Sequence, residues 1–140
     1  MVGREHEKWM RYALSLAEKG RYTTRPNPAV GCVIVKSGQI IGEGFHQKAG
    51  EPHAEVYALQ QASELARGAD VYVTLEPCAH QGRTGPCGQA LIQAGVKRVF
   101  IAMRDPHPKA QGGLKILQQA GIEVFVGECE SEAQELNTGF

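Results

Sequence analysis

Four side chains of the types that bind and use zinc lie in the middle of the chain: His53, Glu55, Cys78 and Cys87. One imidazole and two thiolates provide three zinc ligands, which leaves the fourth tetrahedral position open for a water molecule. An open position is typical of a catalytic zinc site, whereas structural sites use four protein ligands. The predicted metal ligands are therefore His53, Cys78 and Cys87, with Zn²⁺ as the cofactor.

Glu55 follows His53 by two residues and is the predicted catalytic proton carrier. Zinc lowers the pKa of a bound water toward ~7, which provides a hydroxide nucleophile at neutral pH. A carboxylate at this place can take the proton of the water and later deliver it to a leaving amine. Zinc deaminases carry the signature His-x-Glu followed by Pro-Cys-x-x-Cys. The first half is present here, but eight residues rather than two separate Cys78 from Cys87.

The elements that must position these residues follow from apolar periodicity and from glycine and proline stops. The pattern predicts helices over 5–19, 53–66, 86–94 and 114–120. It predicts strands over 30–35, 40–45, 71–75, 99–103 and 124–126, the first two forming a hairpin. Helices that alternate with strands after a hairpin indicate a mixed five-stranded sheet in a three-layer α/β/α sandwich. His53 and Cys87 then lie at helix starts, where active sites of such folds gather.

The length and charge of the chain limit its domain count and its partners. At 140 residues, 1–140 is predicted to form a single domain. Fifteen Lys and Arg balance fifteen Asp and Glu, which favours a small substrate over a nucleic acid. No apolar run approaches the ~20 residues of a membrane span, and the first ten residues lack the apolar segment of a signal peptide. We therefore expect a cytoplasmic protein without a membrane partner.

Other side chains are interpreted as structural. Cys32 is predicted to be a small buried hydrophobe, Cys129 a free surface or edge thiol, and neither a ligand. His6 is expected on a solvated helix face. Gly42 and Gly44 are expected to permit close backbone packing or a bulge. An apolar stripe on the first helix is predicted to face the core: Trp9, Tyr12 and Leu16.

Three stretches carry a resemblance to a known family: TRPNP at 24–28, GEPHAE at 50–55 and TLEPCAHQGRT at 74–84. With the long spacing between the two cysteines, they resemble the pyrimidine deaminase domain of the bifunctional riboflavin-biosynthesis deaminase/reductase. The resemblance runs nearly end to end. It implies the cytidine deaminase-like fold, and it implies the same ligand and proton-carrier roles for His53, Cys78, Cys87 and Glu55.

The resemblance also implies a reaction. Members of this family hydrolytically deaminate 2,5-diamino-6-ribosylamino-4(3H)-pyrimidinone 5′-phosphate to 5-amino-6-(5-phosphoribosylamino)uracil and ammonia. No reductase half follows in this sequence, so we expect a reductase that is either separate or fused in a longer protein. Similar domains assemble, which predicts a homo-oligomer.

By the same similarity, several polar residues are candidate contacts to the pyrimidine, ribose or phosphate. Arg83 and Thr84 suit a phosphate, because they offer a charge-assisted donor and a hydroxyl. Asn27 offers both a donor and an acceptor to a pyrimidine edge. The candidate substrate contacts are Asn27, His46, His80, Arg83, Thr84, Asp105 and His107.

Two departures from the family pattern bear on substrate preference. Gly85 stands where the family usually has proline, and His107 stands where it has asparagine. The stretch 105–112 is also one residue short. Contacts made by this stretch are therefore expected to differ from those of the family.

Two alternatives use the same residues. The fold also carries deaminases of other small molecules or of a flipped-out tRNA base, which the neutral charge and the long cysteine spacing disfavour. A catalytically silent zinc module that binds a partner enzyme is the other alternative, which the presence of Glu55 disfavours.

Overall fold

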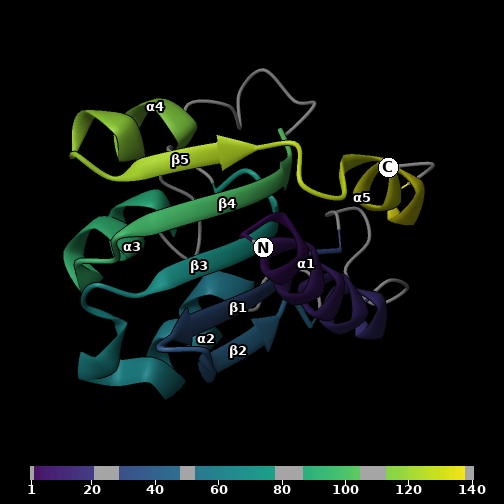
Figure 1. The fold of residues 1–140 in the computed structure, drawn as a ribbon. Coiled ribbons are helices and arrows are strands. Elements are labelled where there is room, and N and C mark those ends of the chain that lie inside the picture. Colours follow the sequence, from purple (N-terminus) through teal and green to yellow (C-terminus); the bar gives the residue numbers. More distant parts are fainter. Residues whose placement is uncertain (1, 21–28, 48–52, 78–86, 105–112, 138–140) are drawn as a thin grey trace.

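The computed structural model describes residues 2–20, 29–47, 53–77, 87–104 and 113–137. Five strands form one sheet in the order β2-β1-β3-β4-β5 (Figure 1). β1 is antiparallel to both β2 and β3, whereas β3, β4 and β5 are parallel. The predicted mixed five-stranded sheet is confirmed. Its strands are β1 Gly31–Lys36, β2 Gln39–Phe45, β3 Asp70–Leu75, β4 Arg98–Met103 and β5 Glu123–Val126.

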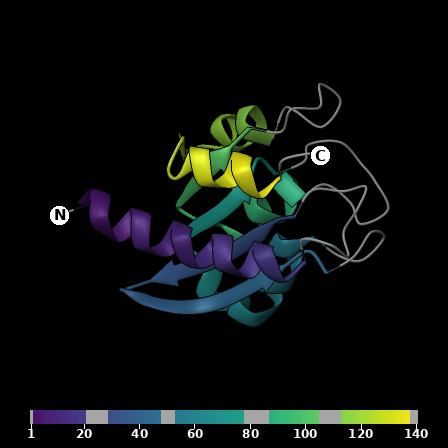
Figure 2. The ribbon, with the colours of Figure 1, turned by 90° about the vertical axis from the view of Figure 1, so that its right-hand side faces the viewer.

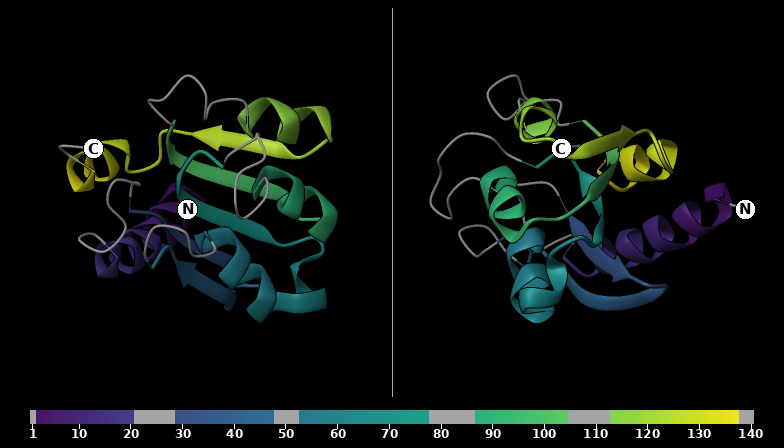
Figure 3. Two further views of the ribbon diagram at one scale, coloured as in Figure 1. Left: turned by 180° about the vertical axis from the view of Figure 1, so that it is seen from behind. Right: turned by 60° about the vertical axis from the view of Figure 1, so that its left-hand side comes forward.

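Helices cover both faces of the sheet, as the right panel of Figure 3 shows. α1 (Val2–Lys19) and α5 (Glu130–Leu136) lie on one face. α2 (Ala54–Ala62), α3 (Cys87–Ala94) and α4 (Gly113–Gln119) lie on the other. This arrangement confirms the three-layer α/β/α sandwich. Among the described residues, no helix has the length and apolar character that a membrane crossing requires.

Two helical segments differ from the sequence prediction. The helix predicted over 53–66 is α-helical only to Ala62, and its last turn is the 3₁₀-helix η1 (Ser63–Ala66). Ser63 has a φ of 53°, a value that interrupts regular helix. α5 was not predicted, because its sequence ESEAQEL is polar and buries only Ala133.

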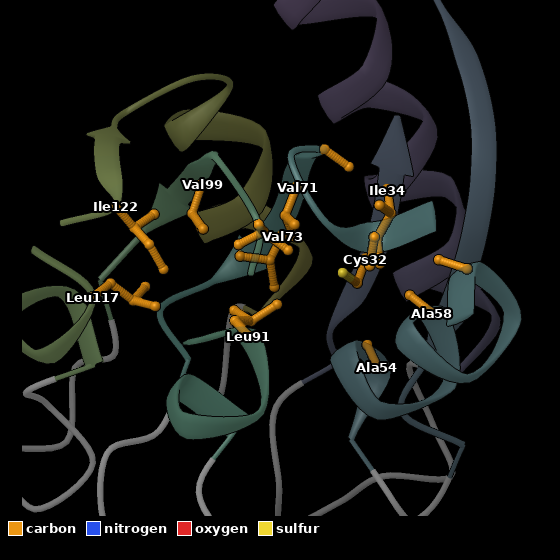
Figure 4. Close-up of a cluster of buried hydrophobic side chains, with 14 of the residues drawn as sticks. Cys32, Ile34, Ala54, Ala58, Val71, Val73, Leu91, Val99, Leu117 and Ile122 are labelled. Carbon is orange, nitrogen blue, oxygen red and sulfur yellow. The ribbon is translucent and has the colours of Figure 1, made fainter. Parts of the chain in front are cut away.

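Side chains that alternate along the strands fill two separate cores. Cys32 and Ile34 of β1 point toward α2, whereas Val33 and Val35 point toward α1. Figure 4 shows the first core, in which Cys32 is fully buried as predicted. The side chains labelled there are Cys32, Ile34, Ala54, Ala58, Val71, Val73, Leu91, Val99, Leu117 and Ile122.

Two predictions for α1 are wrong. Tyr12 does not face the core: it is 38% exposed, and its hydroxyl donates to Glu43 Oε1 at 2.9 Å. His6 is half-buried rather than solvated, with its ring stacked on Phe100 at a centroid distance of 4.2 Å. A hydrogen bond of 2.6 Å joins His6 Nδ1 to the Tyr72 hydroxyl. Burial raises the pKa of this hydroxyl, so it stays protonated. Both errors arise because tyrosine and histidine are amphipathic.

Glycines in β2 allow α2 to lie close against the sheet, as predicted. A Cβ atom at Gly44 would lie 2.5 Å from Tyr57 Cβ and 2.8 Å from the Ala54 carbonyl oxygen. A Cβ atom at Gly42 would meet the Ala58 carbonyl oxygen. The register of β1 and β2 also shifts beside Gly42, which is the expected bulge. Because both glycines face α2, they set the distance between the sheet and the residues at the start of that helix.

Replacing Gly44 with alanine should lower the free energy of unfolding by about 1–3 kcal/mol, since an added methyl group overpacks the contact with α2. Urea denaturation of Gly44→Ala measures the loss. Gln39→Ala, at an exposed position of the same strand, is the control and should stay within about 0.5 kcal/mol of the parent. Equal stability of both variants would show that β2 and α2 do not need this close approach.

Candidate zinc and active site

His53 is the residue on which α2 begins. Its backbone is extended, with a φ of −76° and a ψ of 165°, and its carbonyl oxygen accepts the amide of Val56 at 3.1 Å. Its imidazole makes no capping hydrogen bond to the helix. The backbone of His53 therefore starts the helix, while its side chain is not used as a cap.

His46, a predicted substrate contact, lies directly against His53. The centroids of the two rings are 5.0 Å apart, and the ring planes meet at 86°. His46 is only 2% exposed and directly follows β2, and its amide donates to the carbonyl oxygen of Val30 at 2.9 Å. Two predicted site residues from the end of a strand and the start of a helix therefore converge.

Glu55 lies in the first turn of α2 and is buried, with 3% of its surface exposed. A glutamate that only stabilises a helix dipole is ordinarily in contact with water, whereas burying a carboxylate is costly unless it is paired. Burial raises the pKa of the nearby Cys32 thiol, and the negative charge of Glu55 raises it further. Glu55 therefore lies on the sheet side of the helix, close enough to Cys32 for its charge to act on the thiol.

The other free cysteine lies away from the predicted ligands in the sequence, at the start of α5. Cys129 is half-buried at the start of α5, with a φ of 60°. Burial and the carboxylate of Glu132 raise the pKa of its thiol to about 11. Cys32 and Cys129 thus form no disulfide among the described residues, and it stays a prediction that neither binds metal.

Most of the other predicted site residues lie outside the described residues. Cys87 is the first residue of α3, one residue after the predicted start of this helix, and only its backbone is described. Within the described residues no three His, Cys, Asp or Glu side chains are grouped to hold a metal, and the predicted set needs Cys78 from beyond them. The predicted site residues that lie outside are Asn27, Cys78, His80, Arg83, Thr84, Asp105 and His107.

Strand register gathers the flanks of these segments at one edge of the sheet. Phe45 at the end of β2 pairs with Gly31 at the start of β1, and Cys32 pairs with Val73 near the end of β3. β4 runs parallel to β3, so it ends at the same edge. Figure 2 shows these strand ends on its right-hand side.

The predicted site residues lie, in the sequence, next to strand ends that meet at this edge. Asn27 precedes β1, His46 follows β2, Cys78 follows β3 and Asp105 follows β4. The carboxyl ends of strands are the usual place for active sites in α/β sheets. The topology therefore agrees with the site that the residue types predict.

Glu76 is a site-forming residue that the sequence analysis missed. It follows β3 directly, and its side chain is completely buried. Its Oε1 accepts from Arg104 Nε at 3.3 Å, and its Oε2 accepts from the Leu114 amide at 3.2 Å. Its own amide donates to the Met103 carbonyl oxygen at 2.9 Å. One carboxylate thus joins the ends of β3 and β4 to the start of α4.

These contacts make Glu76 an anchor for described residues that flank two segments with predicted site residues. Arg104 and Leu114 stand on either side of 105–112, and Cys78 follows Glu76 by two residues. Its negative charge also suits the positive end of α4. The position of Glu76 between a buried strand and a proline could have marked it as a buried carboxylate. The sequence does not reveal its partners at the end of β4 and the start of α4.

Replacing Glu76 with glutamine should lower the free energy of unfolding by about 1.5–3 kcal/mol, because charge-assisted hydrogen bonds are lost in a buried place. The amide keeps the shape of the side chain but offers only one acceptor atom to two donors. Urea denaturation measures the change.

Glu123→Gln, at an exposed position of β5, is the matched control and should change stability by less than about 0.5 kcal/mol. If Glu76→Gln were as stable as this control, Glu76 would not be an anchor.

Comparison with known proteins agrees with this fold. The model of the cytidine and deoxycytidylate deaminase zinc-binding region matches residues 3–103. Riboflavin biosynthesis protein RibD of Escherichia coli is 62% identical over 137 residues, which cover 97% of this chain and 37% of that protein.

Two solved structures are similar over nearly the whole chain. RibD of Acinetobacter baumannii, form 2, has a TM-score of 0.98 at 58% identity, covering 100% of this chain and 40% of that one. A Thermotoga maritima protein is described as a diaminohydroxyphosphoribosylaminopyrimidine deaminase/5-amino-6-(5-phosphoribosylamino)uracil reductase. It has a TM-score of 0.94 at 44% identity, covering 98% of this chain and 40% of that one.

The matches to these relatives cover nearly the whole of this chain. The chain spans only about two fifths of the length of each relative. The family model covers the whole segment that holds the predicted ligands, and it describes a zinc-binding region. The chain therefore belongs to the family of the cytidine and deoxycytidylate deaminase zinc-binding region, as a deaminase domain of the RibD type with Zn²⁺ as its cofactor.

Proposed function

We propose that the chain deaminates 2,5-diamino-6-ribosylamino-4(3H)-pyrimidinone 5′-phosphate to 5-amino-6-(5-phosphoribosylamino)uracil and ammonia, in riboflavin biosynthesis. The observation that carries this proposal is the 62% identity with a riboflavin biosynthesis protein over 97% of the chain. The eight residues between Cys78 and Cys87 support it, since other zinc deaminases place two residues there.

In this proposal His53, Cys78 and Cys87 hold the zinc. An imidazole and two thiolates suit this metal in type and number, and they leave one position open. Zinc bound there supplies a Lewis acid and a water of lowered pKa. The start of α2 fixes the backbone of His53, and the ring of His46 limits how the His53 imidazole can turn.

Glu55 is the proposed proton carrier. It accepts the proton of the attacking water as the new carbon–oxygen bond forms at the ring carbon and the electron pair of the ring C=N double bond moves onto the ring nitrogen. It then donates that proton to the departing amine, so that the exocyclic carbon–nitrogen bond breaks, the ring C=N bond re-forms and ammonia leaves. The resulting C–OH group tautomerises to the carbonyl of the product when its proton moves to the ring nitrogen. Its burial keeps bulk water away from the carboxylate, and its place two residues after His53 brings it to the metal site.

The proposed substrate contacts border the same edge of the sheet. Arg83 and Thr84 are assigned to the phosphate, and Asn27 to the pyrimidine edge. His46 supports this assignment by its position, because it is buried directly beside His53. The remaining proposed contacts are His80, Asp105 and His107.

The proposed partner is a reductase, fused or separate, that uses the product. The T. maritima relative is described as carrying both activities, and this chain spans 40% of its length. A homo-oligomer is part of the same proposal.

Supplying the purified chain with the pyrimidinone phosphate, with cytidine and with a tRNA anticodon stem should release ammonia from the first substrate alone. A chelator should abolish this release. Release from cytidine or the stem instead would assign another deaminase activity, and no release from any of the three would leave a zinc module without catalysis. Both of these results contradict the proposal.

Glu55→Gln should bind zinc as the parent does and lose at least ~100-fold in turnover, because a positioned proton carrier is worth that much or more. Metal analysis and ammonia release measure the two effects. Glu64→Gln, on the exposed side of η1, is the control and should keep full turnover. Unchanged turnover of Glu55→Gln would remove Glu55 from the mechanism.

A further inference from the structure

Asn137 makes a two-point contact with a residue that lies 108 positions earlier in the chain. It follows α5 directly, yet its side chain reaches Ala29. The Ala29 amide donates to Asn137 Oδ1 at 2.8 Å, and Asn137 Nδ2 donates to the Ala29 carbonyl oxygen at 3.2 Å. One side-chain amide thus pairs with both backbone groups of a buried residue, and this pairing fixes which way the amide points.

This contact is more than the cap of a helix end. The bond from Asn137 Nδ2 to the Ala133 carbonyl oxygen, which would serve α5 itself, is longer, at 3.5 Å. α5 is also held to α1 by other means, because Arg11 forms an ion pair with Glu132 at 2.8 Å. The two shorter bonds of Asn137 are therefore directed at Ala29.

Ala29 begins a short segment that three different elements hold. The Val30 carbonyl oxygen accepts the His46 amide at 2.9 Å, and the Gly31 amide donates to Thr74 Oγ1 at 3.1 Å. His46 in turn lies against His53. A continuous line of contacts therefore runs from the end of α5, through Ala29 and Val30, to the proposed metal ligand.

We propose that Asn137 is a positioning residue for the deamination, which sets the entry into β1 and, through Val30, the place of His46 beside His53. Asn27, a proposed substrate contact, lies two residues before Ala29 in the sequence. The effect of Asn137 on deamination rests on the proposed function. The coupling from Asn137 to His46 is a property of the folded chain alone.

The chain provides a matched pair of variants. Asn137→Ala removes both bonds to Ala29, and Asn137→Asp keeps the acceptor but turns a second oxygen toward the Ala29 carbonyl. Glu132→Gln weakens the attachment of α5 to α1 and leaves Ala29 untouched. All variants are measured below their unfolding transitions and with their zinc content known.

Amide hydrogen exchange of His46 tests the coupling without substrate. Because this amide donates to Val30, its exchange should accelerate about tenfold or more in both Asn137 variants and stay at the parental rate in Glu132→Gln. The same exchange rate in Asn137→Ala as in the parent would overturn the proposal.

Kinetics with the pyrimidinone phosphate test the catalytic meaning. In both Asn137 variants kcat/KM should fall about tenfold, with KM carrying most of the change and zinc content unaltered, whereas Glu132→Gln should match the parent. An unaltered kcat/KM, or an equal loss in Glu132→Gln, would show that Asn137 is only structural. A parent chain inactive on this substrate would refute the proposed function, and the exchange result would still decide the coupling.

Discussion

The placement of β1 in the sheet is the constraint on which the site depends. Because β1 is antiparallel to both of its neighbours, its start lies beside the end of β2 and the end of β3. β4 is parallel to β3 and ends there too. Segments that are far apart in the sequence therefore leave the sheet at one edge, and α2 begins at that edge with His53. Were β1 parallel to β3, the segment before it would lie at the opposite end of the molecule.

Polar side chains then fix the segments that leave this edge. Glu76 ties the ends of β3 and β4 to α4, and Asn137 ties the entry of β1 to the end of α5. Thr74 accepts the amide of Gly31 within the sheet. Each of these groups has hydrogen-bond partners, which are backbone groups except for the Arg104 side chain, so burial of its polar atoms is compensated. Apolar packing makes the sandwich, whereas these few polar contacts determine where its loops begin.

Much of the fold could be predicted from the sequence, because periodic burial leaves a periodic pattern. β1 and β3 are buried at all but one position each and are mostly apolar, since both of their faces are covered. α5 could not be predicted in this way, because Ala133 alone is buried along its length. Tyr12 was assigned to the core from its spacing, but its hydroxyl finds Glu43 at the surface. A periodic pattern does not say which end of an amphipathic side chain is buried.

The residue types of the proposed site are visible in the sequence, but the tertiary contacts that position them are not. His53 and Glu55 are two residues apart in the chain, so their spacing alone indicates that both belong to one site. The contact of His46 with His53 depends on how β2 meets α2, and the contact of Asn137 with Ala29 joins residues 108 positions apart. Such pairs arise only from the tertiary fold, so no local pattern could reveal them.

X-ray absorption at the zinc edge of the metal-loaded chain tests the central claim most directly, because it counts the ligands by type. The claim that His53, Cys78 and Cys87 hold a catalytic zinc predicts two sulfur atoms at about 2.3 Å and two nitrogen or oxygen atoms at about 2.0–2.1 Å. Cys87→Ser should reduce the count to one sulfur. Three or four sulfur atoms, or a shell that Cys87→Ser leaves unchanged, would contradict it.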